Sequence, residues 1–368
     1  MQIVNLAPEL YPLWNAACSD MDDAWFWHTA EWLEYTLEYR PELRPQSYSF
    51  MVTSEGRVMA ICPLILETRT TPEGSVREFS FGGGPGPGPA LANGLSERLR
   101  KEVLKVVCDE VDAQAHRTAV ARVSFRASPP APAFWHDGLS QPDPLLRFGF
   151  LDIPLATRVI DLSQSEDKLL NQMRKGHRYD VKRSQQLLQA AVYDATNIMP
   201  AVFDQYRLLH HRVAGRVTRP QMTFEMMRDW IGSSMAILVV VRRDGATVGC
   251  ALMSVYKDGA YYSSGCEDPD CSNLPVGHAL QWAAMRWMKE HGIAHYEIGI
   301  QLYGMRPHSM PSEKELNISL FKRGFGGTTV TFWVGEKFYS REYYQAVMRD
   351  RVEKFASAAF VPHAAAAV

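Results

Sequence analysis

The sequence predicts a mixed α/β (α+β) protein made of two related halves, each with a mixed central sheet. Residues 48–65 and 237–254 each consist of two apolar runs, joined by a Glu-Gly turn in the first case and an Asp-Gly turn in the second. Glycine supplies the positive φ that a tight β-hairpin needs. Each hairpin is followed by another strand, a loop, a helical pattern and a strand. We therefore expect two domains of the same construction, residues 1–155 and 156–368.

The elements after each hairpin follow from the apolar periodicity and the helix caps. In the first half we expect an extended piece at 77–83, a helix at 96–114 and a strand at 119–125. In the second half we expect strands at 259–265, 295–300 and 328–335, and helices at 163–189, 199–212, 221–231, 277–291, 312–323 and 340–357.

A loop rich in glycine and proline, SFGGGPGPGPAL at 80–91, raises the question of phosphate binding. A P-loop needs a lysine followed by Ser or Thr at the start of a helix, and this loop has neither. Its prolines also lack the backbone N–H groups that would bind phosphate. We expect either a stiff connection or a loop that lines a substrate site. If the loop touches a substrate, we expect that substrate to be the acceptor.

Composition narrows the class of protein. The formal net charge is -2 in 368 residues, so the molecule as a whole is not an electrostatic nucleic-acid binder. The N-terminus lacks the features of a signal peptide, and no apolar run reaches the ~20 residues of a membrane span. The six cysteines are scattered, which favours reduced thiols and a cytoplasmic location.

Metal chemistry is not expected. Cys266 and Cys271 are the only cysteines close together in the sequence, and no second pair follows them. The histidines show no His-x-x-x-His pair with a placed carboxylate. The histidines considered are His177, His210, His211, His278, His291, His295 and His308.

Two basic motifs are candidates for anion binding. In MRKGHRYDVKRSQ, helical spacing puts Arg174, Arg178 and Lys182 on one face, with Arg183 beside them. This face is either solvated or part of a groove that holds phosphates. In VAGRVTRPQ, Arg216 and Arg219 form either a carboxylate or phosphate clamp or a charged surface turn.

Two helix ends carry further candidates. In LPVGHALQW, Gly277 lies at the expected N-terminus of a helix, where backbone N–H groups attract anions. In LFKRGFGG, Phe321 and Lys322 lie near a helix C-terminus. A lysine with a buried stem can stabilise an oxyanion there, or it can simply be a cation at the end of a helix.

These motifs, in this order, resemble the FemAB-like acyltransferases. TRVIDLSQSEDKLLNQMRKGHRYDVKRSQ is similar to the segment that enters the second domain of that family, with matches at Arg178, Val181 and Arg183. AHYEIG is similar to a family strand end, with Glu297 in place of the usual aspartate. NISLFKRGFGG is similar to a third family motif, which includes Phe321 and Lys322. The resemblance covers residues 158–336.

The resemblance implies two GNAT-like (acyl-CoA N-acyltransferase-like) domains and an acyltransferase activity. Lys322, with Phe321, would stabilise the tetrahedral oxyanion, while the longer arm of Glu297 leaves a base role there open. The arginines above and Gly277 would bind substrates. The implied co-substrate is acyl-CoA or aminoacyl-tRNA, with tRNA a candidate partner, and no cofactor would be tightly bound.

The implied acceptor is a small-molecule amine, either nucleotide-linked or free, from a cell-envelope or secondary-metabolite precursor. The alternative is a non-catalytic GNAT-like protein that binds an anionic ligand or a partner.

Overall fold

The computed structural model describes residues 1–71, 74–136, 143–306 and 308–359. In its first part, two helices near the start are followed by a run of strands, a long helix and a further strand. The elements are β1 (Gln2–Asn5), η1 (Pro8–Leu10), α1 (Tyr11–Asp20), η2 (Phe26–His28), α2 (Ala30–Tyr39), η3 (Pro41–Leu43), β2 (Gln46–Ser47), β3 (Phe50–Ser54), β4 (Arg57–Cys62), β5 (Ile65–Thr71), β6 (Gly74–Phe79), β7 (Gly86–Pro87), β8 (Ala90–Leu91), α3 (Glu97–Arg117), β9 (Arg122–Arg126), α4 (Ala133–His136), η4 (Leu146–Phe148) and β10 (Leu151–Asp152).

The second part begins at the strand that crosses from one half to the other. Its elements are β11 (Leu155–Asp161), α5 (Glu166–Gln172), α6 (Lys175–Leu187), β12 (Gln189–Tyr193), α7 (Pro200–Ala214), α8 (Gln221–Gly232), β13 (Ala236–Arg243), β14 (Ala246–Tyr256), β15 (Gly259–Glu267), η5 (Pro269–Cys271), α9 (Val276–Glu290), β16 (His295–Gln301), α10 (Glu313–Arg323), β17 (Thr328–Phe332), β18 (Val334–Phe338) and α11 (Arg341–Ala359).

Both predicted hairpins are present. β3 pairs with β4 and β13 with β14, all antiparallel. Their turns have positive φ at both central residues, Glu55–Gly56 and Asp244–Gly245, as a hairpin turn between right-twisted strands requires. In each half, a helix then connects two parallel strands. These are β6 and β9, joined by way of α3, and β15 and β16, joined by α9.

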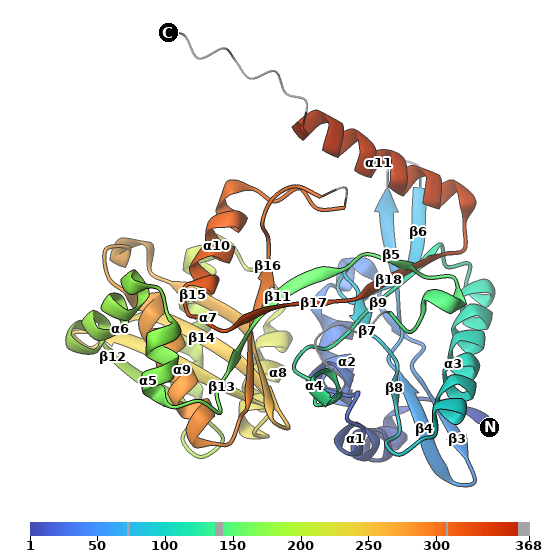
Figure 1. Ribbon diagram of the computed structural model, residues 1–368, viewed down its shortest axis with the longest axis horizontal. Helices are drawn as coiled ribbons and strands as arrows, with labels where there is room; N and C mark the ends of the chain where they lie inside the picture. The colour runs from blue at the N-terminus through green and yellow to red at the C-terminus, as the bar shows by residue number, and fades with distance from the viewer. Residues whose placement is uncertain (72–73, 137–142, 307, 360–368) are drawn as a thin grey trace.

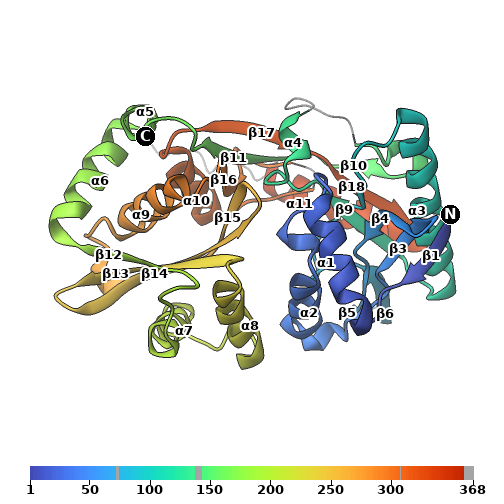
Figure 2. The ribbon, with the colours of Figure 1, turned by 90° about the horizontal axis from the view of Figure 1, so that it is seen from below.

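The sheets confirm the mixed α/β class. The first half holds a sheet of order β1-β3-β4-β8 and one of order β10-β18-β9-β6-β5-β2, and the second half has the order β12-β13-β14-β15-β16-β11-β17. α5, α6 and α9 cover one face of the second sheet, while α7 and α8 cover the other (Figure 2).

Two predicted segments are interrupted. The helix expected at 163–189 begins after a serine cap, Ser165, but it breaks at Met173, where ψ is 150°, so that α6 starts afresh after Arg174. The strand expected at 328–335 divides at Trp333, because β17 joins the second sheet and β18 joins the first. Figure 1 shows β17 and β18 running as one path from one half to the other.

The domain division at 155/156 stays a prediction. The sheets show in addition that the C-terminal elements β18 and α11 return to the first half. β18 pairs with β9 over Arg122–Arg126, and α11 follows β18, so the end of the described chain lies with the first half. A shared aromatic core also joins the halves. Trp25, Phe26 and Tyr35 of the first half pack with Phe224 and Trp230 of α8.

In the described part of the chain, no helix combines the length and the apolar content that crossing a membrane requires.

Candidate active site

Lys322 lies in the last turn of α10, a helix that begins with a capping box. Ser312 Oγ accepts a hydrogen bond from the Glu315 N–H, and the Glu315 carboxylate accepts one from the Ser312 N–H at 2.7 Å. At its other end, the Lys322 side chain crosses β16 at Gly299. A Cβ at Gly299 would lie 2.7 Å from Lys322 Nζ, and the φ of Gly299 is +113°, so this crossing requires glycine.

The ammonium of Lys322 lies where β15 and β16 separate. These strands pair in parallel only from Gly259 to Tyr261 against His295 to Glu297, although both strands continue beyond. Lys322 Nζ lies 5.7 Å from the ring centroid of Tyr262, the next residue along β15. The lysine expected to stabilise an oxyanion therefore points to the place where β15 and β16 separate, and not into bulk solvent.

Glu297 is the carboxylate that interacts electrostatically with Lys322. It is fully buried, and its Oε1 accepts a hydrogen bond from Thr157 Oγ1 at 2.6 Å. Burial raises the pKa of Glu297, and Arg126, Thr157 and Lys322 oppose that shift. Burial lowers the pKa of Lys322, and Glu297 opposes that shift in turn. The two groups therefore stabilise each other's charged forms.

Arg126 reaches this pair from the other half of the molecule. It ends β9, and its Nη2 lies 4.0 Å from Glu297 Oε1. Its guanidinium lies between two aromatic rings, 4.5 Å from the centroid of Trp27 and 4.9 Å from that of Phe332. The candidate site is therefore shared by both halves.

Phe321 packs behind the lysine. Its ring contacts His278 and Phe325, with centroids 5.2 and 5.1 Å away. The backbone oxygen of Phe321 accepts a hydrogen bond from Nε2 of His177, on α6, at 2.9 Å. Burial lowers the pKa of both histidines, that of His278 to about 4, so both are neutral at neutral pH. This group fixes the end of α10 that carries Lys322.

Gly277 is in the first turn of α9, as predicted, but the chain itself supplies the anion there. The Glu267 carboxylate accepts a hydrogen bond from the Gly277 N–H. A Cβ at Gly277 would lie 2.7 Å from Glu267 Oε1, so glycine allows this approach. The helix N-terminus is capped by an internal carboxylate.

The Gly-rich loop shows the same device. The Glu67 carboxylate accepts hydrogen bonds from the N–H groups of Gly82 and Gly83, at 2.7 and 2.8 Å, and from the Ser80 hydroxyl. Glu67 is buried. The first part of the loop is therefore an anion-binding nest that the Glu67 carboxylate occupies. This carboxylate accounts for the glycines, and no bound phosphate is needed to explain them.

The arginines of α6 lie on its outer side. Arg174 is exposed, Arg178 donates to the Asn171 carbonyl, and Arg183 donates to the carbonyl of Asn273. The face that carries Arg174 and Arg178 is thus largely solvated, and Arg183 fastens α6 to the loop before α9.

Arg216 and Arg219 lie on the opposite side of the second sheet, beside the first half. Arg219 Nη1 donates to the hydroxyl of Tyr35 at 2.8 Å. Arg216, Arg219, Arg40 and Gly82 line one cavity of about 590 Å³. The structure therefore brings the arginine loop and the Gly-rich loop together, and it leaves the α6 arginines apart from both.

Sequence reasoning missed Arg126, Thr157 and Tyr262, and it considered His177 only as a metal ligand. A signal for Arg126 existed, because it ends the strand after α3 just as Glu297 lies in the strand after α9. The contacts of His177 and Thr157 span 144 and 140 residues, and no local pattern encodes them. Among the described residues, no three His, Cys, Asp or Glu side chains gather in a way that could hold a metal ion.

Comparison with known proteins agrees with this architecture. Residues 171–306 match the acetyltransferase (GNAT) domain family. They form a GNAT domain. This domain contains β15, α9 and β16, and thus Glu297 and the strand parting. Lys322 follows the matched segment, and Arg126 precedes it.

Solved structures show the same overall fold. The crystal structure of FemX matches with a TM-score of 0.65 at 14% identity, over 95% of this chain and 100% of that one. The C-terminal domain of a putative lysylphosphatidylglycerol synthetase from Agrobacterium fabrum matches with a TM-score of 0.53 at 15% identity, over 89% and 97%. L-PGS from Bacillus licheniformis matches with a TM-score of 0.51 at 15% identity, over 88% and 96%. None of the curated proteins matches the chain significantly. The GNAT domain is therefore part of a FemX-like fold.

Proposed function

We propose that this protein transfers an acyl or aminoacyl group from acyl-CoA or aminoacyl-tRNA to an amine of a cell-envelope or secondary-metabolite precursor. The observation that carries the proposal is the half-buried ammonium of Lys322 at the parting of β15 and β16. A cation held in a site of low polarity stabilises charge that develops during reaction more strongly than one in water.

The reaction assigns a part to each group. The amine nitrogen forms a bond to the carbonyl carbon, and the carbonyl oxygen becomes an oxyanion that Lys322 Nζ stabilises. The ester oxygen or thioester sulfur then leaves with the bonding electrons, and the amine loses a proton to water or to the leaving group. Glu297 is fully buried and keeps Lys322 charged, which favours an electrostatic part over proton transfer.

Of the two donors, the arrangement at α9 favours aminoacyl-tRNA. A CoA pyrophosphate would compete with the Glu267 carboxylate for the Gly277 N–H. The basic side chains of α6 and its N-cap, the exposed Arg174 and Lys182 with the half-buried Arg178, offer charges for a phosphate backbone instead.

The cavity beside the first half supports a phosphorylated acceptor. Arg216 and Arg219 come from the GNAT domain, and Arg40 comes from the first half. Among the described residues, only Arg40 of these three arginines has a carboxylate partner, Glu42 at 2.7 Å. The diphosphate of a nucleoside diphosphate would neutralise the remaining positive charge.

The test compares Lys322→Ala with Lys314→Ala, an exposed lysine on the same helix. The purified proteins are incubated with labelled acetyl-CoA or charged tRNA and an amino-sugar nucleotide, and mass spectrometry follows the acceptor. We expect Lys322→Ala to lower kcat by about 10²–10³-fold with acceptor affinity retained, and Lys314→Ala to match the wild type. Full turnover in Lys322→Ala would contradict the part assigned to Lys322, and no turnover of the wild type with any donor would favour the non-catalytic alternative.

A further inference from the structure

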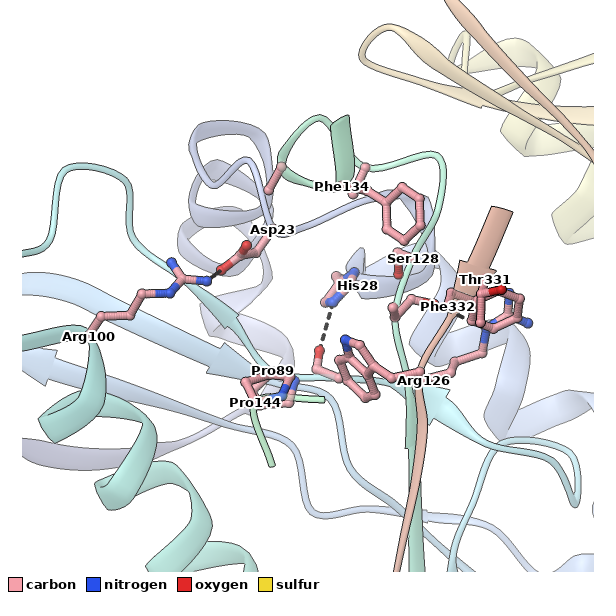
Figure 3. Close-up of a pocket in the computed structure, with 15 residues that line it drawn as sticks. Asp23, His28, Pro89, Arg100, Arg126, Ser128, Phe134, Pro144, Thr331 and Phe332 are labelled. Atoms are coloured by element: carbon pink, nitrogen blue, oxygen red, sulfur yellow. Dashed lines mark hydrogen bonds and ion pairs between the residues drawn. The ribbon is translucent and has the colours of Figure 1, made fainter. Parts of the chain in front are cut away.

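A small cavity lies next to Arg126, on the side of the first half (Figure 3). The end of β9 lines it with Arg126 and Ser128, the Gly-rich loop lines it with Gly88 and Pro89, and α4 lines it with Phe134. Its volume is about 120 Å³, which corresponds to roughly four waters. A group of a few carbon and oxygen atoms would fill it.

Two hydrogen-bond donors at this cavity are unused. Arg126 Nη2 and Ser128 Oγ are buried without a hydrogen-bond partner in the described part of the chain. Ser128 is 7% exposed. The rings of Trp27 and Phe332 fix the plane of the guanidinium, and its Nε donates to the Ala127 carbonyl at 3.3 Å. Because buried polar groups are nearly always paired, these two donors indicate a missing acceptor.

His28 and the Asp23–Arg100 pair, which also line the cavity, already have partners. Nδ1 of His28 accepts a hydrogen bond from the Trp25 N–H at 3.1 Å, and Nε2 donates to the Gly88 carbonyl at 2.9 Å. Burial lowers the pKa of His28 to about 4, so the ring is neutral. Asp23 pairs with Arg100 at 2.7 Å, at the opposite end of the cavity from Arg126 in Figure 3. Arg126 is therefore the charge that a ligand would meet.

The walls are largely apolar. Phe134, Phe332 and Trp333 line the cavity together with Ala131. Gly88 leaves room for Trp333, because a Cβ there would lie 2.6 Å from the ring. A ligand that fits would combine an acceptor group for Arg126 and Ser128 with a compact apolar body.

We propose that this cavity binds a small organic carboxylate carried by one of the two substrates. The charge balance favours a carboxylate, because Arg126 and Lys322 are two cations near one buried anion, Glu297. This inference rests on the proposed function for its substrates. Either the acceptor or the transferred acyl group would carry the carboxylate.

The test measures binding alone. Titration calorimetry compares benzoate with benzamide on the full chain, and we expect benzoate to bind roughly tenfold more tightly, since it accepts charge-assisted hydrogen bonds. Arg126→Gln should abolish this preference, and Ser128→Ala should weaken benzoate binding by roughly fivefold. Arg98→Gln, on the exposed side of α3, is the matched control and should change nothing.

Two results would overturn the inference. Equal affinity for benzoate and benzamide would show that the site has no preference for a carboxylate. The Ala133→Phe substitution narrows the cavity, so unchanged benzoate binding in that variant would show that benzoate binds elsewhere. If Arg126→Gln does not fold, Ser128→Ala and Ala133→Phe still decide. This assay needs no donor. If the protein binds benzoate as expected but transfers no acyl group, the cavity proposal stands and the proposed function does not.

The source of the carboxylate follows from inhibition of the transfer reaction. Benzoate that competes with the acceptor assigns the carboxylate to the acceptor, and benzoate that competes with the donor assigns it to the acyl group. Inhibition that competes with neither substrate counts against a substrate carboxylate in this cavity.

Discussion

Two half-buried arginines on one strand differ in how they bind the carboxylates that they face. Arg122 and Arg126 are four residues apart on β9, so their side chains leave the same face of the sheet. Arg122 lies between Glu78 and Glu336, whereas Arg126 faces Glu297. All three carboxylates are buried.

The Arg122 cluster is fully bonded. Arg122 reaches Glu78 at 2.7 Å and Glu336 at 2.8 Å. Glu78 also accepts a hydrogen bond from the Tyr343 hydroxyl at 2.9 Å, and Glu336 accepts two from Arg351 at 2.9 Å each. This network joins β6, β9, β18 and α11, so its function is to hold the fold together.

The Arg126 cluster is only partly bonded. Glu297 Oε2 and Arg126 Nη2 have no hydrogen-bond partner among the residues described. Polar atoms left unpaired in a buried site lower the free energy of unfolding unless a ligand completes them. The difference between the clusters separates a structural network from a candidate site, although both contain the same residue types.

The largest effect is expected from Arg122→Ala. It leaves Glu78 and Glu336 buried without their shared cation, which should lower the free energy of unfolding by about 3–5 kcal/mol. Arg126→Ala should cost less than half as much, because Arg126 Nη2 lies 4.0 Å from Glu297 Oε1 and makes no hydrogen bond to it, so that less is lost with the guanidinium. Guanidinium denaturation measures both, with the exposed Arg98→Ala as the control. Equal losses for the two variants would contradict the comparison.

A smaller effect separates the carboxylates themselves. Glu78→Gln should lower the free energy of unfolding at neutral pH by about 1–3 kcal/mol, because the amide faces donors that it cannot accept from fully. Glu297→Gln should be neutral or stabilising. The raised pKa of Glu297 means that its contribution to stability is complete at low pH and is lost as pH rises through that raised value.

The pH dependence is therefore the sharper measurement. Across the range above the ordinary carboxyl pKa, wild-type stability should fall relative to Glu297→Gln as pH rises, and the gap should then level off. Denaturation at a series of pH values records both curves. Parallel curves would mean that Glu297 ionises in the fold as easily as in water.

Local sequence signals predicted the parts of the fold that local physics determines. Both hairpins were found because Gly56 and Gly245 adopt positive φ at the turns. The helix starts expected at Ser96 and Ser312 are confirmed, and at each the serine side chain accepts a hydrogen bond from the N–H three residues later. Lys322 was a candidate from its place at a helix end, family resemblance added Phe321, and their catalytic part stays a prediction.

What the sequence did not predict depends on distant partners. Trp333 divides an apolar run that has no break in its pattern, because the two sheets compete for the strand. The contact between Arg126 and Glu297 joins strands of different halves, so the sequence around either residue does not predict the contact. The anion at Gly277 was expected from a ligand, and Glu267 of the neighbouring strand supplies it instead.

The smallest effect concerns the Gly-rich loop behind Arg126. Gly88 donates its N–H to the Arg126 carbonyl at 2.9 Å, and a Cβ there would lie 2.6 Å from the Trp333 ring. Gly88→Ala should therefore lower the free energy of unfolding by about 1–3 kcal/mol through overpacking. In the same loop, a Cβ at Gly84 would lie 3.7 Å from its nearest neighbour, an ordinary contact.

Gly84→Ala is thus the matched control and should stay within about 0.5 kcal/mol of the wild type. Denaturation of both variants tests whether the loop supports the Arg126 cluster or merely connects a strand to a helix. If the loop is only a connection, Trp333 can move aside and both substitutions will be tolerated equally. If the loop supports the cluster, Gly88→Ala alone will be destabilised, and its affinity for benzoate will fall with it because Trp333 lines the same cavity.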